Sequence, residues 1–346
     1  MRILLLPFSW IWSVLLILRN FLYNKGWLRS FEFDFPIILV GNLSTGGTGK
    51  TPHVEYLIRL LKKDRKVATL SRGYKRQMQG YGLATELSLT EDIGDEPKLF
   101  KQKYPDVEVA VDENRVEGVY YLLNDEPDVR VIIMDDGFQH RRIKAGFNII
   151  LTAYDHSYYK DFVLPAGNLR EPRAGARRAD CVIVTRCPVQ LSEAEKTAIE
   201  NKLHLTKDQR VYFTSLHYGE ITPLFKMGEE DASPSGDEIF LLTGIANNRS
   251  LTDHLSGRFH TITPLKYPDH HYFSEQDLRF IQKKAGSGCI ITTEKDAMRL
   301  MEQEELIREL GLHIWVIPIE VKFLADGDRF DQQLADFLSR YPIAAT

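Results

Sequence analysis

The chain has few cysteines and no surplus of positive charge, and each shortage excludes a class of protein. Its 346 residues include three scattered cysteines, Cys181, Cys187 and Cys289. That number is too small for a disulfide framework or a zinc site, and it suits a reducing compartment. The formal net charge is −4 at pH 7, which disfavours a nucleic-acid binder that works by bulk positive charge. We therefore expect no nucleic-acid partner.

Long apolar runs are also scarce, and the exception lies at the start of the chain. Residues 3–18 carry no charge and include Trp10 and Trp12. The run is shorter than the ~20 apolar residues of a membrane-spanning helix, and no small-residue cleavage site follows it, as a secretory signal would require. We expect residues 1–26 to form an apolar membrane-docking helix that lies partly in one leaflet. A buried core helix and a single membrane span are the alternatives.

The rest of the chain alternates short apolar runs with stretches of helical spacing. The strand-length runs cover 36–40, 66–70, 107–111, 129–134, 147–152 and 181–185, and the pattern restarts at 239–243, 260–263, 289–293 and 313–319. Apolar runs without alternation are typical of a parallel sheet covered on both faces. The polar stretch 228–237 separates the two series. We predict an α/β fold with a larger domain at 27–215 and a smaller α/β domain at 216–346.

A glycine-rich stretch between the first strand run and a helix predicts a phosphate-binding loop. Residues 41–51 read GNLSTGGTGKT. Backbone N–H groups of such a loop bind phosphate oxygens, and the dipole of the following helix assists them. Its lysine reaches the β- and γ-phosphates, and the hydroxyl after it holds Mg²⁺. The predicted nucleotide contacts are Ser44, Thr45, Gly46, Gly47, Thr48, Gly49, Lys50 and Thr51, although Ser44 stands where the common motif has its first glycine.

Two carboxylates end a later strand run. Asp135 and Asp136 follow the apolar residues 131–134. In open α/β sheets, ligands bind at the carboxyl ends of the strands. One of these aspartates, with Thr51, is therefore a candidate Mg²⁺ ligand, directly or through water. A simple strand-end turn is the alternative, because Asp-Gly is a common turn pair.

Basic residues after other strands suggest a site for an anionic acceptor. Ser71 and Arg72 follow the second strand run, and Arg170 belongs to an arginine cluster at 169–178. Cationic side chains that converge from several strand ends can hold a charged substrate. Ordinary solvated surface charge is the alternative for individual members of the cluster.

Two further positions are candidates for acid–base chemistry. Asp95 lies in the acidic loop 94–97, where it is either a general base or a cap of the next helix. His270 stands beside Asp269 and His271, where it can tune a base or bind a phosphate.

A phosphate loop alone does not separate an enzyme from a nucleotide switch. Guanine-specific switches carry an [NT]-K-x-D motif, and residues 293–296 read TEKD, with Glu294 in place of the lysine. Guanine specificity is therefore unsupported. A membrane-tethered P-loop NTPase switch remains the alternative to a kinase, because both contain a phosphate loop.

The motifs taken together resemble those of the tetraacyldisaccharide 4′-kinase family, the lipid A 4′-kinases. The matching stretches follow the order of the family along nearly the whole chain. They are VGNLSTGGTGKTP at 40–52, SRGY at 71–74, GDEP at 94–97, DDGFQH at 135–140, PAGNLREP at 165–172, TGIAN at 243–247, PDHH at 268–271 and TTEKDA at 292–297.

The resemblance implies an activity and a division of roles. It implies transfer of the γ-phosphoryl group of ATP, with Mg²⁺, to the 4′-hydroxyl of a tetraacyl glucosamine disaccharide 1-phosphate, which gives lipid IVA. It implies a P-loop kinase-type α/β/α sandwich whose smaller α/β domain closes over the nucleotide. The implied site residues are Asp95 and His270 as the base pair, Lys50 at the phosphates, Asp135 and Asp136 at Mg²⁺, and Gln139, Arg170 and Glu171 near the transferred group or the glycolipid.

The resemblance also implies a location. A lipid A precursor belongs to a Gram-negative-type envelope, so we expect a peripheral or monotopic protein on the cytoplasmic face of the inner membrane. Its expected partners are the glycolipid and the membrane surface, and we predict no protein partner.

Overall fold

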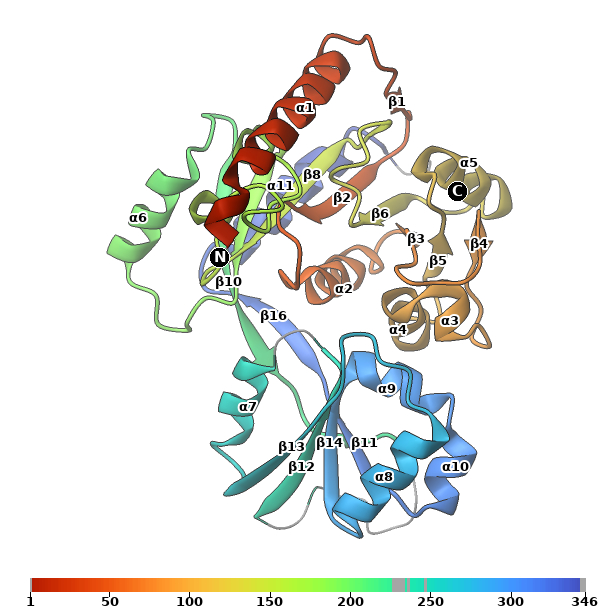
Figure 1. The fold of residues 1–346 in the computed structure, drawn as a ribbon. Helices are drawn as coiled ribbons and strands as arrows, with labels where there is room; N and C mark the ends of the chain where they lie inside the picture. The colour runs from red at the N-terminus through yellow and green to blue at the C-terminus, as the bar shows by residue number, and fades with distance from the viewer. Residues whose placement is uncertain (1, 226–233, 235–236, 246–247, 343–346) are drawn as a thin grey trace.

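The computed structural model describes residues 2–225, 234, 237–245 and 248–342. It has a larger and a smaller α/β half, one above the other in Figure 1. Most of the separating stretch 228–237 that the sequence suggests lies outside the described residues.

The larger half is built on a nine-stranded sheet of order β16-β10-β9-β8-β2-β6-β3-β5-β4. Neighbouring strands are parallel except at the two edges, where β4 and β16 run antiparallel. The strands are β2 (Ile37–Asn42), β3 (Val67–Ser71), β4 (Gly82–Leu83), β5 (Glu108–Val111), β6 (Val131–Asp135), β8 (Phe147–Ala153), β9 (Cys181–Thr185), β10 (Arg210–Tyr218) and β16 (Ile319–Phe323). The short strands β1 (Phe31–Glu32) and β7 (Ile143–Lys144) form a separate pair.

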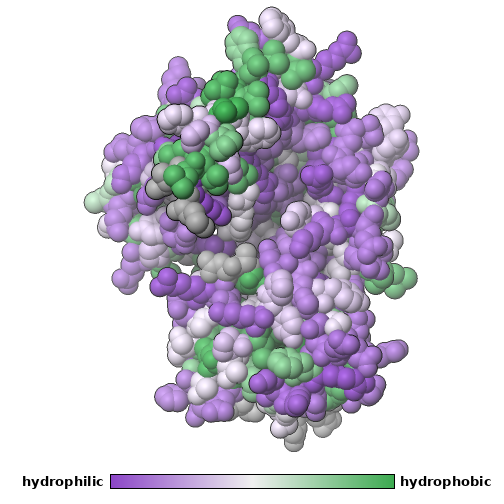
Figure 2. All heavy atoms as spheres, in the orientation of Figure 1, coloured by the Kyte–Doolittle hydropathy of each residue, from purple (hydrophilic) through white to green (hydrophobic). Residues whose placement is uncertain are grey.

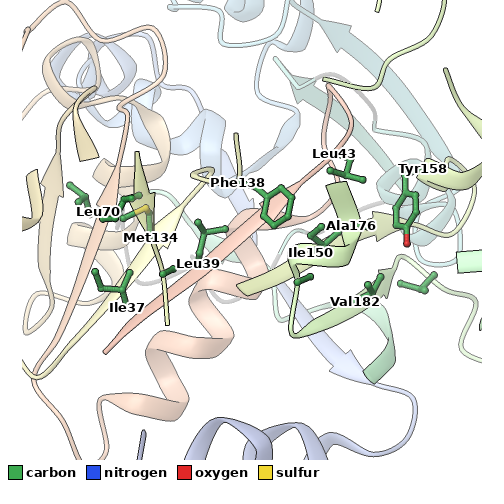
Figure 3. Close-up of a cluster of buried hydrophobic side chains, with 14 of the residues drawn as sticks. Ile37, Leu39, Leu43, Leu70, Met134, Phe138, Ile150, Tyr158, Ala176 and Val182 are labelled. Atoms are coloured by element: carbon green, nitrogen blue, oxygen red, sulfur yellow. The ribbon is translucent and has the colours of Figure 1, made fainter. Parts of the chain in front are cut away.

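Both faces of this sheet are covered, as the unbroken apolar runs predict. Successive residues of β2 point to opposite faces, so Leu39 enters one core (Figure 3) and Ile38 the other. The larger half contains α2 (Lys50–Leu61), α3 (Thr90–Ile93), α4 (Asp95–Lys103), α5 (Arg115–Asp125), α6 (Glu193–Leu203), α11 (Gly327–Leu338) and the 3-10 helices η2 (Tyr158–Lys160) and η3 (Arg173–Arg178). Helices α2 and α11 share the core that contains Ile38.

The smaller half is a five-stranded sheet of order β11-β15-β14-β12-β13, parallel except for β11. Its strands are β11 (Thr222–Pro223), β12 (Glu238–Thr243), β13 (Thr261–Lys266), β14 (Cys289–Thr293) and β15 (Ile314–Ile317). Its helices are α7 (Arg249–Leu255), α8 (Glu275–Ala285), α9 (Glu294–Met301) and α10 (Glu304–Glu309). This half corresponds to the smaller α/β domain that the sequence predicts.

The path of the chain between the halves differs from the simple boundary at residue 216. The end of β10 pairs with β16, so the chain leaves the larger half along one strand and returns along its neighbour. Helix α11 then buries Phe330, Leu334 and Phe337 in the larger core. Residues 319–338 therefore lie with the larger half, because their apolar side chains complete its sheet and core.

The two halves meet where α4 packs against α9. Leu99 of α4 forms a small apolar cluster with Ala297 and Met298 of α9. Two ion pairs flank this cluster, Lys103 Nζ to Glu294 Oε1 at 2.6 Å and Lys295 Nζ to Glu96 Oε1 at 2.5 Å. The contact brings the loop before α4 next to the smaller half.

Helix α1 (Leu6–Asn24) follows the 3-10 helix η1 (Arg2–Leu5) and lies along one side of the larger half (Figure 1). Its apolar side chains face outward, with Phe8 62% and Trp10 67% exposed, and Figure 2 shows apolar atoms gathered along it. Within the described part of the chain, it is the one helix long and apolar enough to cross a membrane. The alternative of a buried core helix is wrong, because Ser9 and Leu16 are the only members of α1 classed as buried.

The polar residues of α1 attach the helix to the body of the protein. The serine, arginine and asparagine side chains of this helix all make hydrogen bonds, and four of these side chains bond to other segments. These bonds are Ser9 Oγ from Ala166 N at 2.9 Å, Arg19 Nη2 to Gln139 O at 2.6 Å, Asn20 Nδ2 to Glu171 Oε2 at 3.3 Å, and Asn24 Oδ1 from Arg141 Nη2 at 2.8 Å. The helix is therefore amphipathic with its polar side toward the protein and its apolar side toward the surroundings.

Candidate active site

The phosphate loop connects the end of β2 to the first turn of α2. Gly49 precedes the helix with φ +84°, a left-handed conformation that favours glycine. Side chains behind the loop hold its backbone: Thr185 Oγ1 donates to Thr48 O at 2.8 Å and Asn42 Nδ2 to Thr48 Oγ1 at 2.8 Å. The strand, loop and helix that the sequence predicts are all present, and the first N–H groups of α2 are free to bind an anion.

The register of the sheet places the strand-end aspartates beside this loop. Val40 of β2 pairs with Asp135 of β6. Asp136 follows in a left-handed conformation. Its carboxylate accepts two bonds from Arg170 Nη1, at 2.9 and 3.0 Å, and lies 3.6 Å from Lys50 Nζ. Burial acts to raise the pKa of Asp136, but Lys50 and Arg170 outweigh it and hold that pKa below its usual value.

Asp135 has the opposite environment. Its Oδ1 is buried and makes no hydrogen bond to any described residue. Burial raises the pKa of Asp135 to about 7, although Lys50 acts against the rise. A buried carboxylate oxygen without a partner is costly unless a cation or water completes it.

These residues fit a Mg²⁺ ion shared with a nucleotide. Mg²⁺ is usually held by one or two carboxylates together with waters and substrate phosphates. The hydroxyl-bearing Thr51 is buried on the first turn of α2 and Asp135 supplies a free oxygen. Within the described residues there is no group of three or more His, Cys, Asp or Glu able to hold an ion by themselves, so phosphate and water ligands would complete the shell.

Asp95 and His270 meet across the junction of the two halves. His270 Nδ1 lies 2.7 Å from Asp95 Oδ2, and the imidazole packs on the ring of Tyr74 at 5.1 Å between centroids. Asp95 is the first residue of α4, and the cap position is Gly94, which has no side chain to cap the helix. The alternative in which Asp95 serves as a side-chain cap is therefore wrong for this structure.

The predicted acceptor residues divide into two groups. Gln139, Arg170 and Glu171 lie together: Gln139 Nε2 donates to Glu171 Oε1 at 2.9 Å and to Asn42 O at 2.9 Å, beside the phosphate loop. Glu171 is buried and also binds Arg178 at 2.9 Å. Ser71 is instead turned inward, where its Oγ accepts from Gly73 N at 3.2 Å, and Arg72 is exposed at the end of β3.

Sequence reasoning missed several charged residues at the junction. Arg299 is buried and donates to Asp95 Oδ2 and to Asp296 Oδ1. Lys295 and Glu96 form their ion pair close enough to Asp135 to influence its pKa. Lys295 lies in the stretch TEKD at 293–296, which differs from the guanine-specific motif at Glu294. Arg299 has no local signal, because its partner Asp95 lies far away in the sequence.

Comparisons with known proteins find relatives that span nearly the whole chain. The family model described as tetraacyldisaccharide-1-P 4′-kinase matches residues 1–339. A tetraacyldisaccharide 4′-kinase of Flavobacterium johnsoniae is 45% identical over 98% of this chain and 97% of its own length. One from Bacteroides thetaiotaomicron is 42% identical over 96% and 92%. A crystal structure of LpxK from Aquifex aeolicus in complex with ATP is 28% identical, covers 97% of this chain and 99% of its own, and superposes with a TM-score of 0.76.

Proposed function

Because the chain belongs to the tetraacyldisaccharide-1-phosphate 4′-kinase family, we propose how its residues divide the work of the kinase reaction. The protein is an ATP-dependent kinase that phosphorylates the 4′-hydroxyl of the lipid A disaccharide precursor, a step of lipid A biosynthesis. ATP is the phosphoryl donor, and Mg²⁺ is the usual metal of such a transfer.

The observation that carries the proposal is the meeting of three groups at one edge of the larger sheet. The phosphate loop, the free carboxylate oxygen of Asp135 and the Asp95–His270 pair lie around the junction of the two halves. Phosphoryl transfer needs these three functions: a cradle for phosphates, a metal ligand and an acceptor for the proton of the attacking hydroxyl.

The phosphate loop binds the nucleotide. Backbone N–H groups of residues 46–49 and of the first turn of α2 bind the phosphate oxygens, together with the hydroxyls of Ser44 and Thr48. Thr45 does not join them as the sequence predicts, because its N–H and its hydroxyl donate to Asn168 O at 2.7 and 3.2 Å. Lys50 contacts the transferred phosphoryl group, and the Asp136 carboxylate, itself held by Arg170, attracts the lysine into place. Lys50 thus stabilises charge that develops during transfer.

Thr51 and Asp135 are the residues that would hold Mg²⁺, since Asp136 is already paired with two cations. The metal supplies neutralisation of phosphate charge. Asp136 contributes by orienting Lys50 and Arg170 on the side of the site where Gln139 lies.

The Asp95–His270 pair takes the proton from the 4′-hydroxyl as the new bond to phosphorus forms. The two groups share a hydrogen bond of 2.7 Å, so His270 can orient the Asp95 carboxylate toward the attacking hydroxyl. The sugar of the acceptor and its phosphate are positioned by four side chains, those of Arg72, Gln139, Arg170 and Glu171. Ser71 shapes the turn behind Arg72.

The N-terminal helix brings the active site to the lipid. Its outward apolar side suits the interface of a membrane, with the tryptophans at headgroup depth. Because ATP is available in the cytoplasm, we expect the protein to be a peripheral or monotopic enzyme on the cytoplasmic face of the inner membrane.

Phosphoryl transfer itself provides the test. Purified protein is incubated with γ-³²P-ATP and a tetraacyl glucosamine disaccharide 1-phosphate dispersed in detergent, and the lipid products are separated by chromatography. A kinase produces one labelled lipid per ATP consumed and hydrolyses little ATP without the acceptor. Slow hydrolysis that ignores the acceptor, with no labelled lipid, would contradict the assignment and favour a nucleotide switch.

The two sides of α1 give separable predictions. Removing residues 1–24 should leave a folded protein that binds ATP but works poorly on lipid in vesicles, because membrane contact and the bonds to Gln139 and Glu171 are lost together. The double change Trp10→Glu and Ile17→Glu, at exposed positions, should abolish sedimentation with vesicles and keep most activity on detergent-dispersed acceptor.

The matched control for this experiment lies on the opposite side of the helix. Asn20→Ala removes the bond to Glu171 and should keep vesicle binding while lowering activity in detergent severalfold. Normal vesicle binding by the Trp10→Glu, Ile17→Glu variant would contradict the membrane assignment. Unfolding of the 1–24 deletion with loss of ATP binding would show that α1 is needed for the fold itself.

A further inference from the structure

We infer that Arg299 is a positioning residue for the Asp95–His270 pair: it reaches from the smaller half to hold the Asp95 carboxylate in a fixed orientation. The inference rests on the function proposed above, because it concerns the groups assigned to proton transfer.

The guanidinium of Arg299 is fixed from its own half before it reaches Asp95. Its Nη2 donates to Asp296 Oδ1, one turn earlier in α9, and lies 3.4 Å from Gly244 O at the end of β12. Its Nη1 donates to Asp95 Oδ2. The planar fork thus joins a rigid anchor in the smaller half to the carboxylate of the larger half, a geometry that arginine can form and lysine cannot.

Both donors to Asp95 meet the same oxygen. His270 Nδ1 and Arg299 Nη1 each contact Oδ2, and no described residue donates a hydrogen bond to Oδ1. The rotation of the carboxylate is therefore set from one side, and Oδ1 remains the oxygen that is open to a substrate hydroxyl. Neither neighbour of Asp95 alone would fix both its position and its orientation.

The charge of Arg299 acts on the pair over a short distance with little solvent between them. The side chain of Arg299 is 3% exposed and that of Asp95 is 8% exposed. In such surroundings water screens the attraction between a guanidinium and a carboxylate only weakly, so the contact holds the carboxylate firmly.

Other charged groups around the pair do not replace Arg299. Those that face Asp95 or His270 are Asp269 on the same loop as His270, with Oδ2 3.8 Å from Nε2, the ion-paired Glu96 and Lys295, and Asp296, which is itself bound to Arg299. Lys75 donates to the backbone of Asp269. Lys295 is occupied by Glu96, so Arg299 is the cation in direct contact with the Asp95 carboxylate among the described residues.

The test compares kcat and the KM for ATP of three variants in the full-length protein. Arg299→Gln removes the charge and the fork, Arg299→Lys keeps the charge without the fork, and Arg279→Gln is the matched control on the exposed face of α8, where Arg279 pairs with Glu275. Thermal unfolding shows that each variant is folded.

Arg299→Gln should lower kcat by about tenfold or more, with the KM for ATP unchanged. The loss follows because the Asp95 carboxylate is then oriented by His270 without the arginine fork. Arg299→Lys should restore only part of the rate, and Arg279→Gln should match the wild type.

A folded Arg299→Gln protein with the wild-type kcat would overturn the inference. If that variant does not fold, Arg299→Lys decides: a wild-type kcat without the planar fork would overturn the inference equally. The proposed function is tested separately, because near-normal activity of Asp95→Asn would remove the base assignment itself. Loss of activity in Asp95→Asn with a wild-type kcat in Arg299→Gln would reject the role of Arg299 alone.

Discussion

Replacing Lys50 with alanine should lower kcat by a factor on the order of a hundred or more. Lys50 opens α2 directly after the loop, and its ammonium lies 3.6 Å from Asp136 Oδ1. Its charge is placed where the γ-phosphoryl group leaves ADP, and this charge matters most in the transition state. Single-turnover transfer of ³²P to the acceptor measures the loss directly.

The fold should survive this change. The Lys50 side chain is partly exposed, and Asp136 keeps its two bonds to Arg170, so the Asp136 carboxylate is not left unpaired. Lys62→Ala, at the far end of α2 where the lysine binds the exposed Asp106, is the matched control and should retain full activity. A folded Lys50→Ala protein with wild-type turnover would eliminate the proposed role of the phosphate loop.

Asp95→Asn should reduce turnover by roughly 10²–10⁴-fold, the range of a positioned general base. Asparagine has the shape of aspartate and can still accept hydrogen bonds from His270 and Arg299, but it cannot take up a proton. ATP binding, measured by calorimetry, should stay close to that of the wild type, because Asp95 lies outside the phosphate loop. The double variant with His270→Ala should cost little more than the worse single change, since paired catalytic groups act as a unit.

A control and a contrary outcome complete this prediction. Asp106→Asn changes an exposed aspartate shortly after α4 and should leave the rate unchanged. Melting curves reveal any stability lost at Asp95, where the buried Arg299 would face a neutral amide instead of a carboxylate. A near-normal rate in a folded Asp95→Asn protein would contradict the base assignment.

The parts of the site that depend on neighbouring residues in the chain could be predicted from sequence. The phosphate loop is one continuous stretch, and the strand before it and the helix after it are visible as local patterns. Asp135 and Asp136 follow a buried strand, and parallel strands bring their carboxyl ends to one edge. What the pattern could not decide was how the two aspartates differ, because this depends on Lys50 and Arg170, which reach Asp136 from other elements.

Tertiary contacts determine the parts of the site that could not be predicted from the sequence. The polar residues of α1 are few, and nothing in the sequence shows what they contact. In the structure they bind loops far away in the sequence, such as those of Gln139 and Glu171. Hydrophobic periodicity reports which residues share a face of a helix, and it does not say whether the polar or the apolar face is turned toward the protein. Arg299 was invisible for the same reason, since its position in α9 gives no sign of Asp95 across the junction.

The return of the chain to the larger half sets an order for its folding during synthesis. Domains usually fold as units while the chain emerges from its N-terminus. Here the edge strand β16 and the helix α11 follow the smaller half in the sequence, and Phe330 and Leu334 fill the same core as Val54 and Ile58 of α2. A nascent chain that has already produced the phosphate loop and the whole smaller half therefore still leaves one side of α2 uncovered, and α11 covers that side once it has emerged.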